Sequence, residues 1–133
     1  MNSKELFVRD TTVIKKSDNL FTAEVSDNWS IGNTANGGYS MTLAAKAMSE
    51  FLEHKDPLSI SAHYLDRVDF GATELHVTHL SSSKSLSTAR VELIQNNKIK
   101  IIFIGTFTDF SFKNDMNIYE RDVPSFPDYE SCE

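Results

Sequence analysis

Four consecutive residues, Asn36-Gly37-Gly38-Tyr39, carry the clearest chemical signal in the sequence. They come directly before a stretch with helical periodicity, so they would begin a helix. The first backbone N–H groups of a helix have no partner within it and lie at its positive end. Because Gly37 and Gly38 have no side chains, a ligand could approach these groups closely. The N–H groups of Gly38 and Tyr39 could then stabilise an oxyanion that develops on a bound carbonyl group.

Asn36 has two possible roles at this helix start. It could cap the helix, or it could donate a hydrogen bond to a ligand. Asn-Gly-Gly is also a common turn sequence, which would give the whole segment a structural role. The local sequence leaves both roles open.

A hydrolytic site also needs a group that activates water, usually a carboxylate or an imidazole. His63 lies on a predicted strand, and Ser59 and Ser61 share its face. Because histidine titrates near neutral pH, His63 could act as the base, and Ser61 could contact the ligand. Alternatively, these polar residues form the solvent-facing side of a half-buried strand.

Gln95 ends a predicted strand just before a turn. Its amide could lie in water at the edge, or it could orient a group of the ligand. His76 and His79 fall on opposite faces of their strand, so they would not share a metal ion. No set of His, Cys and carboxylates has the spacing of metal ligands, so the sequence predicts no metal and no cofactor.

One helix and a series of strands must position these residues. Apolar residues recur at three- and four-residue intervals over residues 39–53, which predicts an amphipathic helix. Asn96-Asn97 predicts a hairpin turn, because Asn tolerates positive φ. The continuous apolar run 101–104 predicts burial on both faces of its strand. The predicted strands cover residues 11–16, 20–26, 58–64, 73–80, 85–95 and 98–110.

Two strands, one helix and four further strands define the α+β class, with an antiparallel sheet. The helix has a wide apolar stripe, so the sheet must wrap around it. We expect residues 1–110 to form the domain. Residues 111–133 contain prolines and acidic residues without periodicity, which predicts a C-terminal tail.

Composition narrows the class of protein. The net charge of −6 argues against a nucleic-acid partner, which would require a basic surface. No apolar run reaches the roughly 20 residues needed to cross a membrane, and the N-terminus lacks an apolar secretory segment. Cys132 is the one cysteine and cannot form an internal disulfide, so we expect a cytoplasmic protein.

Several segments together resemble the TesB-like acyl-CoA thioesterases, a branch of the hotdog superfamily. Their order and spacing over about residues 25–110 carry the resemblance. The segments are Trp29-Ser30-Ile31, Asn36-Gly37-Gly38-Tyr39 with the Ala-rich helix after it, and residues 56–65 and 85–98. The resemblance implies a single hotdog fold and an acyl-CoA substrate, with coenzyme A as part of that substrate.

The resemblance also implies where the substrate would lie. Water would attack a carbonyl held at Gly38 and Tyr39, and the acyl chain would occupy an apolar slot near Met41, with Met48 or Phe51 beside it. The family has an Arg- and Gly-containing loop before its long strand. Here that loop is residues 81–84, and Lys84 could contact a phosphate of coenzyme A.

Two departures from the family bear on catalysis. Many hotdog thioesterases carry an acid on the central helix, whereas residues 42–48 contain none. The alternative to a hydrolase is therefore a non-catalytic hotdog subunit that binds acyl groups or completes an assembly. The family also joins two hotdog halves in one chain, and this sequence resembles the first half, with a tail similar to the linker between them. Either the second half is missing or is supplied by another chain, or two copies pair. We favour the homodimer, because pairing covers an exposed sheet edge and an apolar face.

Overall fold

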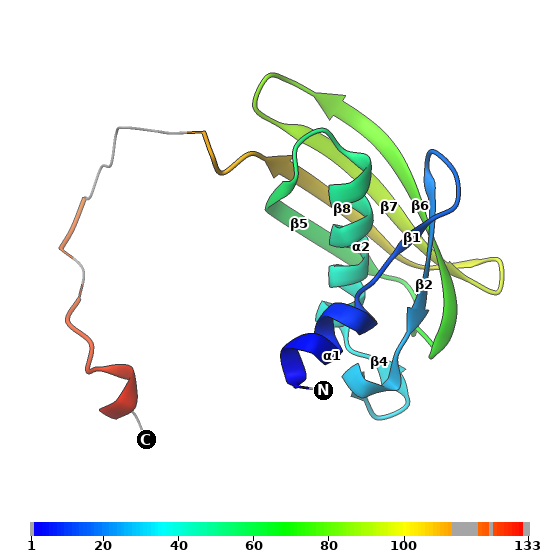
Figure 1. Ribbon diagram of the computed structural model, residues 1–133, viewed down its shortest axis with the longest axis horizontal. Helices are drawn as coiled ribbons and strands as arrows, with labels where there is room; N and C mark the ends of the chain where they lie inside the picture. The colour runs from blue at the N-terminus through cyan, green and yellow to red at the C-terminus, as the bar shows by residue number, and fades with distance from the viewer. Residues whose placement is uncertain (1, 113–119, 123, 132–133) are drawn as a thin grey trace.

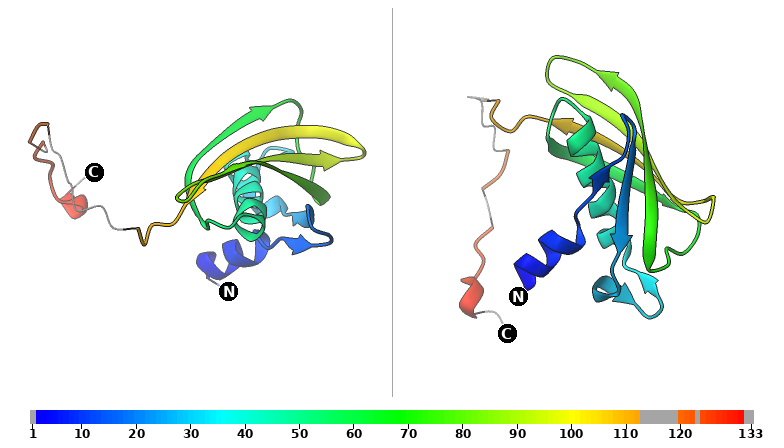
Figure 2. Two further views of the ribbon diagram at one scale, coloured as in Figure 1. Left: turned by 90° about the horizontal axis from the view of Figure 1, so that it is seen from above. Right: turned by 45° about the vertical axis from the view of Figure 1, so that its right-hand side comes forward.

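The computed structural model describes residues 2–112, 120–122 and 124–131, so Cys132 lies outside the described residues. An antiparallel six-stranded sheet, in the order β1-β2-β6-β7-β8-β5, curves around the central helix α2 (Figure 1; Figure 2, left). This confirms the predicted α+β class and the wrapped helix. The elements are α1 (Ser3–Asp10), β1 (Ile14–Lys15), β2 (Leu20–Val25), the 3-10 helix η1 (Asp27–Trp29), β3 (Ser30–Ile31), β4 (Thr34–Ala35), α2 (Gly37–Phe51), β5 (Asp56–Tyr64), β6 (Gly71–Ser82), β7 (Ser87–Gln95), β8 (Lys98–Thr108) and the 3-10 helix η2 (Tyr129–Ser131).

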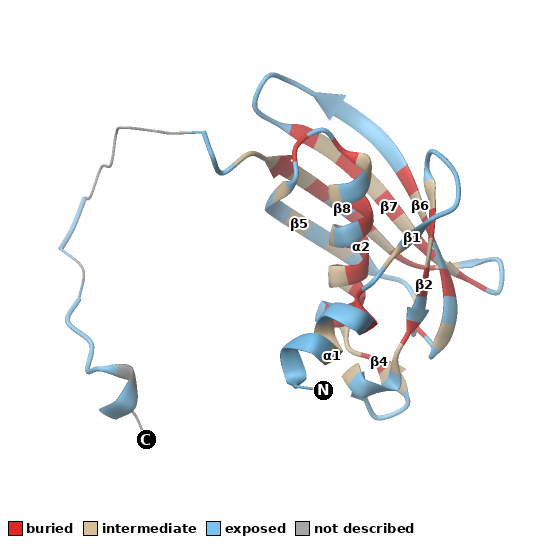
Figure 3. Cartoon of the chain, viewed as in Figure 1, coloured by how far each residue is buried: buried red, intermediate tan, exposed pale blue. Residues whose placement is uncertain are grey.

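Helix α2 packs its apolar face on the concave side of the sheet, where the core lies (Figure 3). Leu43, Ala44 and Ala47 on this face are fully buried. Gly105 of β8 leaves room for the Met48 side chain of the helix: a Cβ on Gly105 would lie 2.5 Å from Met48 Sδ. The helix begins two residues before the predicted start and ends at Phe51, because Leu52 adopts an extended conformation.

The hairpin β7–β8 has the predicted turn, with φ angles of 52° at Asn96 and 59° at Asn97. The prediction that β8 is buried on both faces is wrong for this chain. Ile101 and Phe103 point into the core, whereas Ile104 on the opposite face is 40% exposed. Among the described residues, no helix covers the convex face of the sheet (Figure 2, left). The alternating pattern of one buried face therefore holds even within an apolar run.

Helix α1 was not predicted, and the strand predicted over residues 11–16 is shortened to Ile14–Lys15. A capping box starts α1: the Asn2 side chain accepts from the Glu5 N–H at 2.9 Å, and Glu5 accepts from the Asn2 N–H at 3.0 Å. Asn-x-x-Glu is the sequence signal that could have found this helix. At its other end the Thr11 hydroxyl donates to the Phe7 carbonyl at 2.8 Å.

Candidate functional site

Asn36 is the N-cap of α2. Its side-chain oxygen accepts from the N–H groups of Gly38 at 2.8 Å and Tyr39 at 3.3 Å. Its own N–H donates to the Trp29 carbonyl at 2.8 Å. The two amides predicted to bind a carbonyl oxygen are therefore held by the Asn36 carboxamide, which occupies the position that a ligand oxygen would take.

Gly37 and Gly38 allow two close approaches at this turn. A Cβ on Gly37 would lie 2.9 Å from the hydroxyl oxygen of Tyr64, and a Cβ on Gly38 would lie 3.2 Å from the Asn36 side-chain oxygen. The Tyr64 hydroxyl donates to the Gly37 carbonyl at 3.1 Å. The double glycine thus lets the end of β5 pack against the first turn of α2.

The side chain of Tyr39 is 4% exposed. Its hydroxyl donates to the Asp10 carbonyl at 2.7 Å and accepts from the Ser26 N–H at 3.1 Å. Burial raises the pKa of Tyr39 above its ordinary value. Only the backbone of Tyr39 is therefore placed to bind a substrate, while its ring joins α2 to the residues after α1 and β2.

Asp10 is a buried carboxylate beside the helix start. Its Oδ2 accepts from Asn28 Nδ2 at 2.9 Å and from Trp29 Nε1 at 3.1 Å, and its Oδ1 accepts from Arg9 Nε at 2.7 Å. The Asn28 hydrogen bond, with those from Arg9, Ser26 and Trp29, lowers the pKa of Asp10 to about 2 against the effect of burial. Nothing in the local sequence pointed to this cluster, because the donors Asn28 and Trp29 lie 18 and 19 residues away from Asp10 in the sequence.

A cavity of about 440 Å³ opens at the first turn of α2. Asn36, Gly38, Tyr39 and Thr42 at the start of α2 line it, together with Phe7 and Trp29. The Phe7 and Trp29 rings meet edge to face with centroids 5.0 Å apart, and Trp29 stacks on Tyr39 at 6.3 Å. The helix start therefore faces a space that is lined by both polar groups and aromatic rings.

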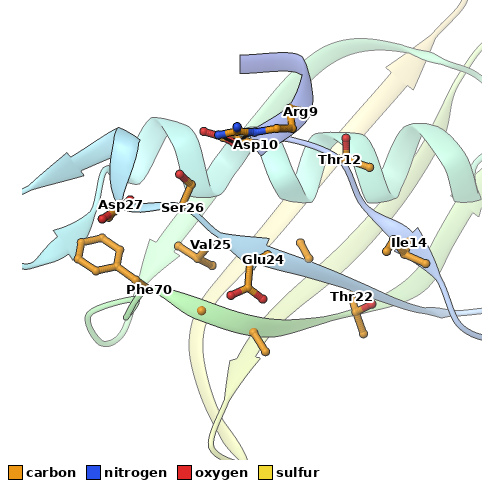
Figure 4. Close-up of a pocket in the computed structure, with 13 residues that line it drawn as sticks. Arg9, Asp10, Thr12, Ile14, Thr22, Glu24, Val25, Ser26, Asp27 and Phe70 are labelled. Atoms are coloured by element: carbon orange, nitrogen blue, oxygen red, sulfur yellow. Dashed lines mark hydrogen bonds and ion pairs between the residues drawn. The ribbon is translucent and has the colours of Figure 1, made fainter. Parts of the chain in front are cut away.

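A larger cavity, of about 690 Å³, lies along β2 (Figure 4). Figure 4 shows Arg9 and Asp10 across from Glu24 and Phe70, and Asp27 also lines the space. Three carboxylates against one guanidinium would repel the phosphates of coenzyme A. The smaller cavity at the helix start is the better candidate for a substrate site.

The structure does not bring His63 or Ser61 to the helix start. Ile60 and Ala62 of β5 pack against the core, so Ser61 and His63 lie on the opposite, convex face of the sheet. Both are exposed, and the Ser61 hydroxyl reaches only the Ile104 carbonyl, at 3.5 Å. Their exposure agrees with the alternative interpretation, in which these polar residues form the solvent-facing side of a half-buried strand.

Lys84 lies at the far end of α2. Its carbonyl is 3.2 Å from Nε2 of His54, which follows the last turn of α2 and is 7% exposed. The 15 residues of α2 place this end about 21 Å from the helix start. His54 pairs with buried Ser87 at 2.6 Å. Lys55 donates to the Leu52 carbonyl at the end of α2.

Gln95 is buried and bonded to the backbone of the β5–β6 loop. Its Oε1 accepts from the Asp69 N–H at 3.0 Å, and its Nε2 donates to the Asp69 carbonyl at 2.8 Å. The amide is thus neither in water nor directed at the helix start, and it fixes the loop instead.

Among the apolar residues predicted to line an acyl slot, only some are accessible. Met41 and Phe51 are half-buried on α2 and pack against the core. Met48 is fully buried against Gly105. An acyl chain could therefore lie along Met41 but could not reach Met48.

No group of three or more His, Cys, Asp or Glu side chains that could hold a metal ion occurs in the described part of the chain. Within the same residues, no helix has the length and apolar character needed to cross a membrane.

The sheet order and the central helix define a hotdog domain, and solved structures share it. The tesB protein of Mycobacterium avium subs. paratuberculosis is 20% identical with a TM-score of 0.80, covering 97% of this chain and 50% of that one. A hotdog-fold protein of Alicyclobacillus acidocaldarius is 12% identical with a TM-score of 0.80, covering 94% and 47%. The TT0310 protein of Thermus thermophilus is 21% identical with a TM-score of 0.65, covering 83% and 100%.

Residues 25–109 match the family described as the acyl-CoA thioesterase N-terminal domain, and the chain belongs to this family. The resemblance found in the sequence is thereby confirmed. The chain spans about half the length of the first two structures above. No curated protein sequence matches it.

Proposed function

We propose that this protein hydrolyses acyl-CoA thioesters, with the thioester carbonyl held at the N-terminus of α2. The observation that carries the proposal is the Asn36-capped double-glycine turn, which opens on a cavity within a domain of the acyl-CoA thioesterase N-terminal family. Water adds to the carbonyl carbon, the C–S bond breaks, and the products are a carboxylic acid and the free thiol of coenzyme A. The first amides of α2 stabilise the oxyanion of the intermediate.

Asn36 would take part in binding by giving up its cap position. Its oxygen lies 2.8 Å from the Gly38 nitrogen, so a thioester oxygen can bond to this amide only if the carboxamide turns aside. After that rotation, the NH₂ group of Asn36 can donate a second hydrogen bond to the substrate. The cap thus stabilises the empty site and yields to the ligand.

The group that activates water is expected from a second hotdog unit. Asp10 is a poor base, because three side chains donate to its carboxylate and its pKa is about 2. Residues 37–48 of α2 contain no acid. The half-length match to double-sized relatives supports a second unit, either another copy of this chain or a separate second half.

Pairing would use β5, which ends the sheet next to β8 and has a free edge. Leu58 is 57% exposed and Leu65 is 60% exposed at the two ends of this strand. Strand addition would satisfy the free edge and cover these side chains and Met41. We favour a homodimer.

The second candidate function is a non-catalytic subunit that binds acyl groups, and the absence of an acid in residues 37–48 favours it. The two functions differ in one observable: a binding subunit holds acyl-CoA without releasing thiol. A cytoplasmic location remains a prediction, based on the single cysteine.

The test is thiol release from short-, medium- and long-chain acyl-CoA, with binding followed by the fluorescence of Trp29, the one tryptophan. Release that saturates with substrate supports the hydrolase. Binding without release would favour the alternative. If the protein neither binds acyl-CoA nor releases thiol, both functions are rejected.

A further inference from the structure

Asp10 joins four parts of the chain that are distant in sequence. It ends α1, and its carboxylate accepts from Asn28 and Trp29 at the end of η1. Its carbonyl accepts from the Tyr39 hydroxyl of α2, which in turn accepts from the Ser26 N–H after β2. Among the described residues, Asp10 is the one carboxylate that is buried, and such a charge requires several donors.

These contacts continue to the amides at the helix start. Trp29 is held at its indole N–H by Asp10, and its carbonyl accepts from the Asn36 N–H at 2.8 Å. The Asn36 backbone leads directly into Gly37 and Gly38, the first residues of α2, and this link remains when the Asn36 side chain turns aside. A continuous series of hydrogen bonds and covalent links therefore connects the Asp10 carboxylate to the predicted oxyanion-binding amide.

The same contacts fix one wall of the cavity. Trp29 lies between Phe7, at a centroid distance of 5.0 Å, and Tyr39, at 6.3 Å. Without an acceptor at the indole N–H, this ring would lose the bond that orients it, and the space beside Asn36 and Gly38 would change shape.

We propose that Asp10 is a positioning residue for thioester hydrolysis: it orients Trp29 and, through the Trp29 carbonyl and Asn36, the first amides of α2. The inference rests on the proposed function, because it assigns Asp10 a role in the same site. Asp10 does not touch the substrate. Its effect is to keep the amides and the cavity wall in one geometry, which oxyanion stabilisation requires.

The first test compares Asp10→Asn with a control at the far end of α2, Ser87→Ala. Asn has the same shape but only one acceptor oxygen, so it cannot accept from Arg9 and from the pair Asn28 and Trp29 at the same time. Ser87→Ala removes the buried partner of His54. At a temperature where both variants are folded, we expect kcat to fall at least tenfold in Asp10→Asn, with a smaller change in KM, and to stay unchanged in Ser87→Ala. If the loss of activity in Asp10→Asn is no larger than the fraction of the variant that is unfolded, the proposal is overturned.

A second variant tests the route through Trp29. Trp29→Phe keeps an aromatic ring but removes the indole N–H that Asp10 accepts. If Asp10 acts through this bond, the double variant loses no more activity than the more damaged single variant. Fully additive losses in kcat would show that the two residues act independently and would contradict the proposal.

Binding separates a failure of this inference from a failure of the proposed function. A non-hydrolysable thioether analogue of acyl-CoA is titrated while Trp29 emission is recorded. If the wild type binds but hydrolyses nothing, and the change in Trp29 emission on binding differs in Asp10→Asn, catalysis is rejected while the orientation of Trp29 by Asp10 stands. The same emission change in both proteins would show that the Trp29 ring keeps its orientation without the Asp10 carboxylate and would reject the positioning role.

Discussion

At the scale of single residues, the two glycines of the turn have different neighbours. Gly37 faces the ring of Tyr64: a Cβ on Gly37 would lie 3.0 Å from Tyr64 Cζ. Gly38 faces the side chain of Asn36, the N-cap of α2. Gly37 therefore sets how closely the end of β5 approaches α2. Gly38 keeps the ligand side of the turn open.

Gly37→Ala is expected to destabilise the protein by about 1–3 kcal/mol, because the new methyl group overlaps the Tyr64 ring. Urea unfolding measures the change. In the background of Tyr64→Ala the ring is absent, so adding Gly37→Ala there should cost less than it costs in the wild type. An equal cost in both backgrounds would show that the overlap is not the cause.

The pKa of Asp10 predicts a specific response to acid. The folded-state pKa of about 2 lies below the ordinary 3.8, so the stabilisation is fully present above about pH 4 and is lost as the pH falls toward 2. The free energy of unfolding of the wild type should therefore approach that of Asp10→Asn over this range. Urea unfolding at several pH values measures it, and a constant difference between the two proteins would contradict the assignment.

A second carboxylate with a lowered pKa, Asp66, does not disturb this comparison between the two proteins. The Lys98 ammonium holds the pKa of Asp66 well below its usual range, so acid also weakens this exposed pair. Both proteins contain Asp66, and its contribution cancels in the difference between them.

At the scale of elements, the sequence correctly predicted the central helix and a hairpin turn, which short-range sequence signals specify. The periodicity of residues 39–53 and the Asn96-Asn97 turn describe α2 and the β7–β8 hairpin, because a few neighbouring residues specify each. Helix α1 was missed although its capping box is local, because the stretch after it looked like a strand.

The site residues were harder to predict, because their partners lie far along the chain. Asp10 bonds to a residue 19 positions away and Gln95 to one 26 positions away. His54 and Ser87 are 33 apart. A sequence pattern shows that Gln95 precedes a turn, but it does not show that the β5–β6 loop folds back to enclose its amide.

The first turn of α2 allows stability and activity to be separated. In Asn36→Asp the carboxylate can still cap Gly38 and Tyr39, and a negative charge suits the N-terminus of a helix, so the free energy of unfolding should be unchanged or raised by less than about 1 kcal/mol. The same charge opposes an oxyanion, so thioester turnover should fall at least tenfold. Unchanged or faster turnover in a stable Asn36→Asp protein would contradict the oxyanion role of this turn.

At the scale of the whole molecule, the proposal includes a second unit, and three features support it. The chain covers about half of the double-sized relatives, β5 has a free edge, and α2 begins without an acid. We expect the mass measured in solution to be that of a dimer, with activity lost on dilution below its dissociation constant. A monomer that hydrolyses acyl-CoA would contradict the expected role of the partner.

The central claim is that the N-terminus of α2 binds a thioester carbonyl for hydrolysis. Thiol release from the acyl-CoA panel tests it most directly, measured in parallel for the wild-type protein and for Asn36→Asp. We predict saturable release by the wild type and release at least tenfold slower by the folded variant. No release by the wild type from any acyl-CoA, or equal release by both proteins, would contradict the claim.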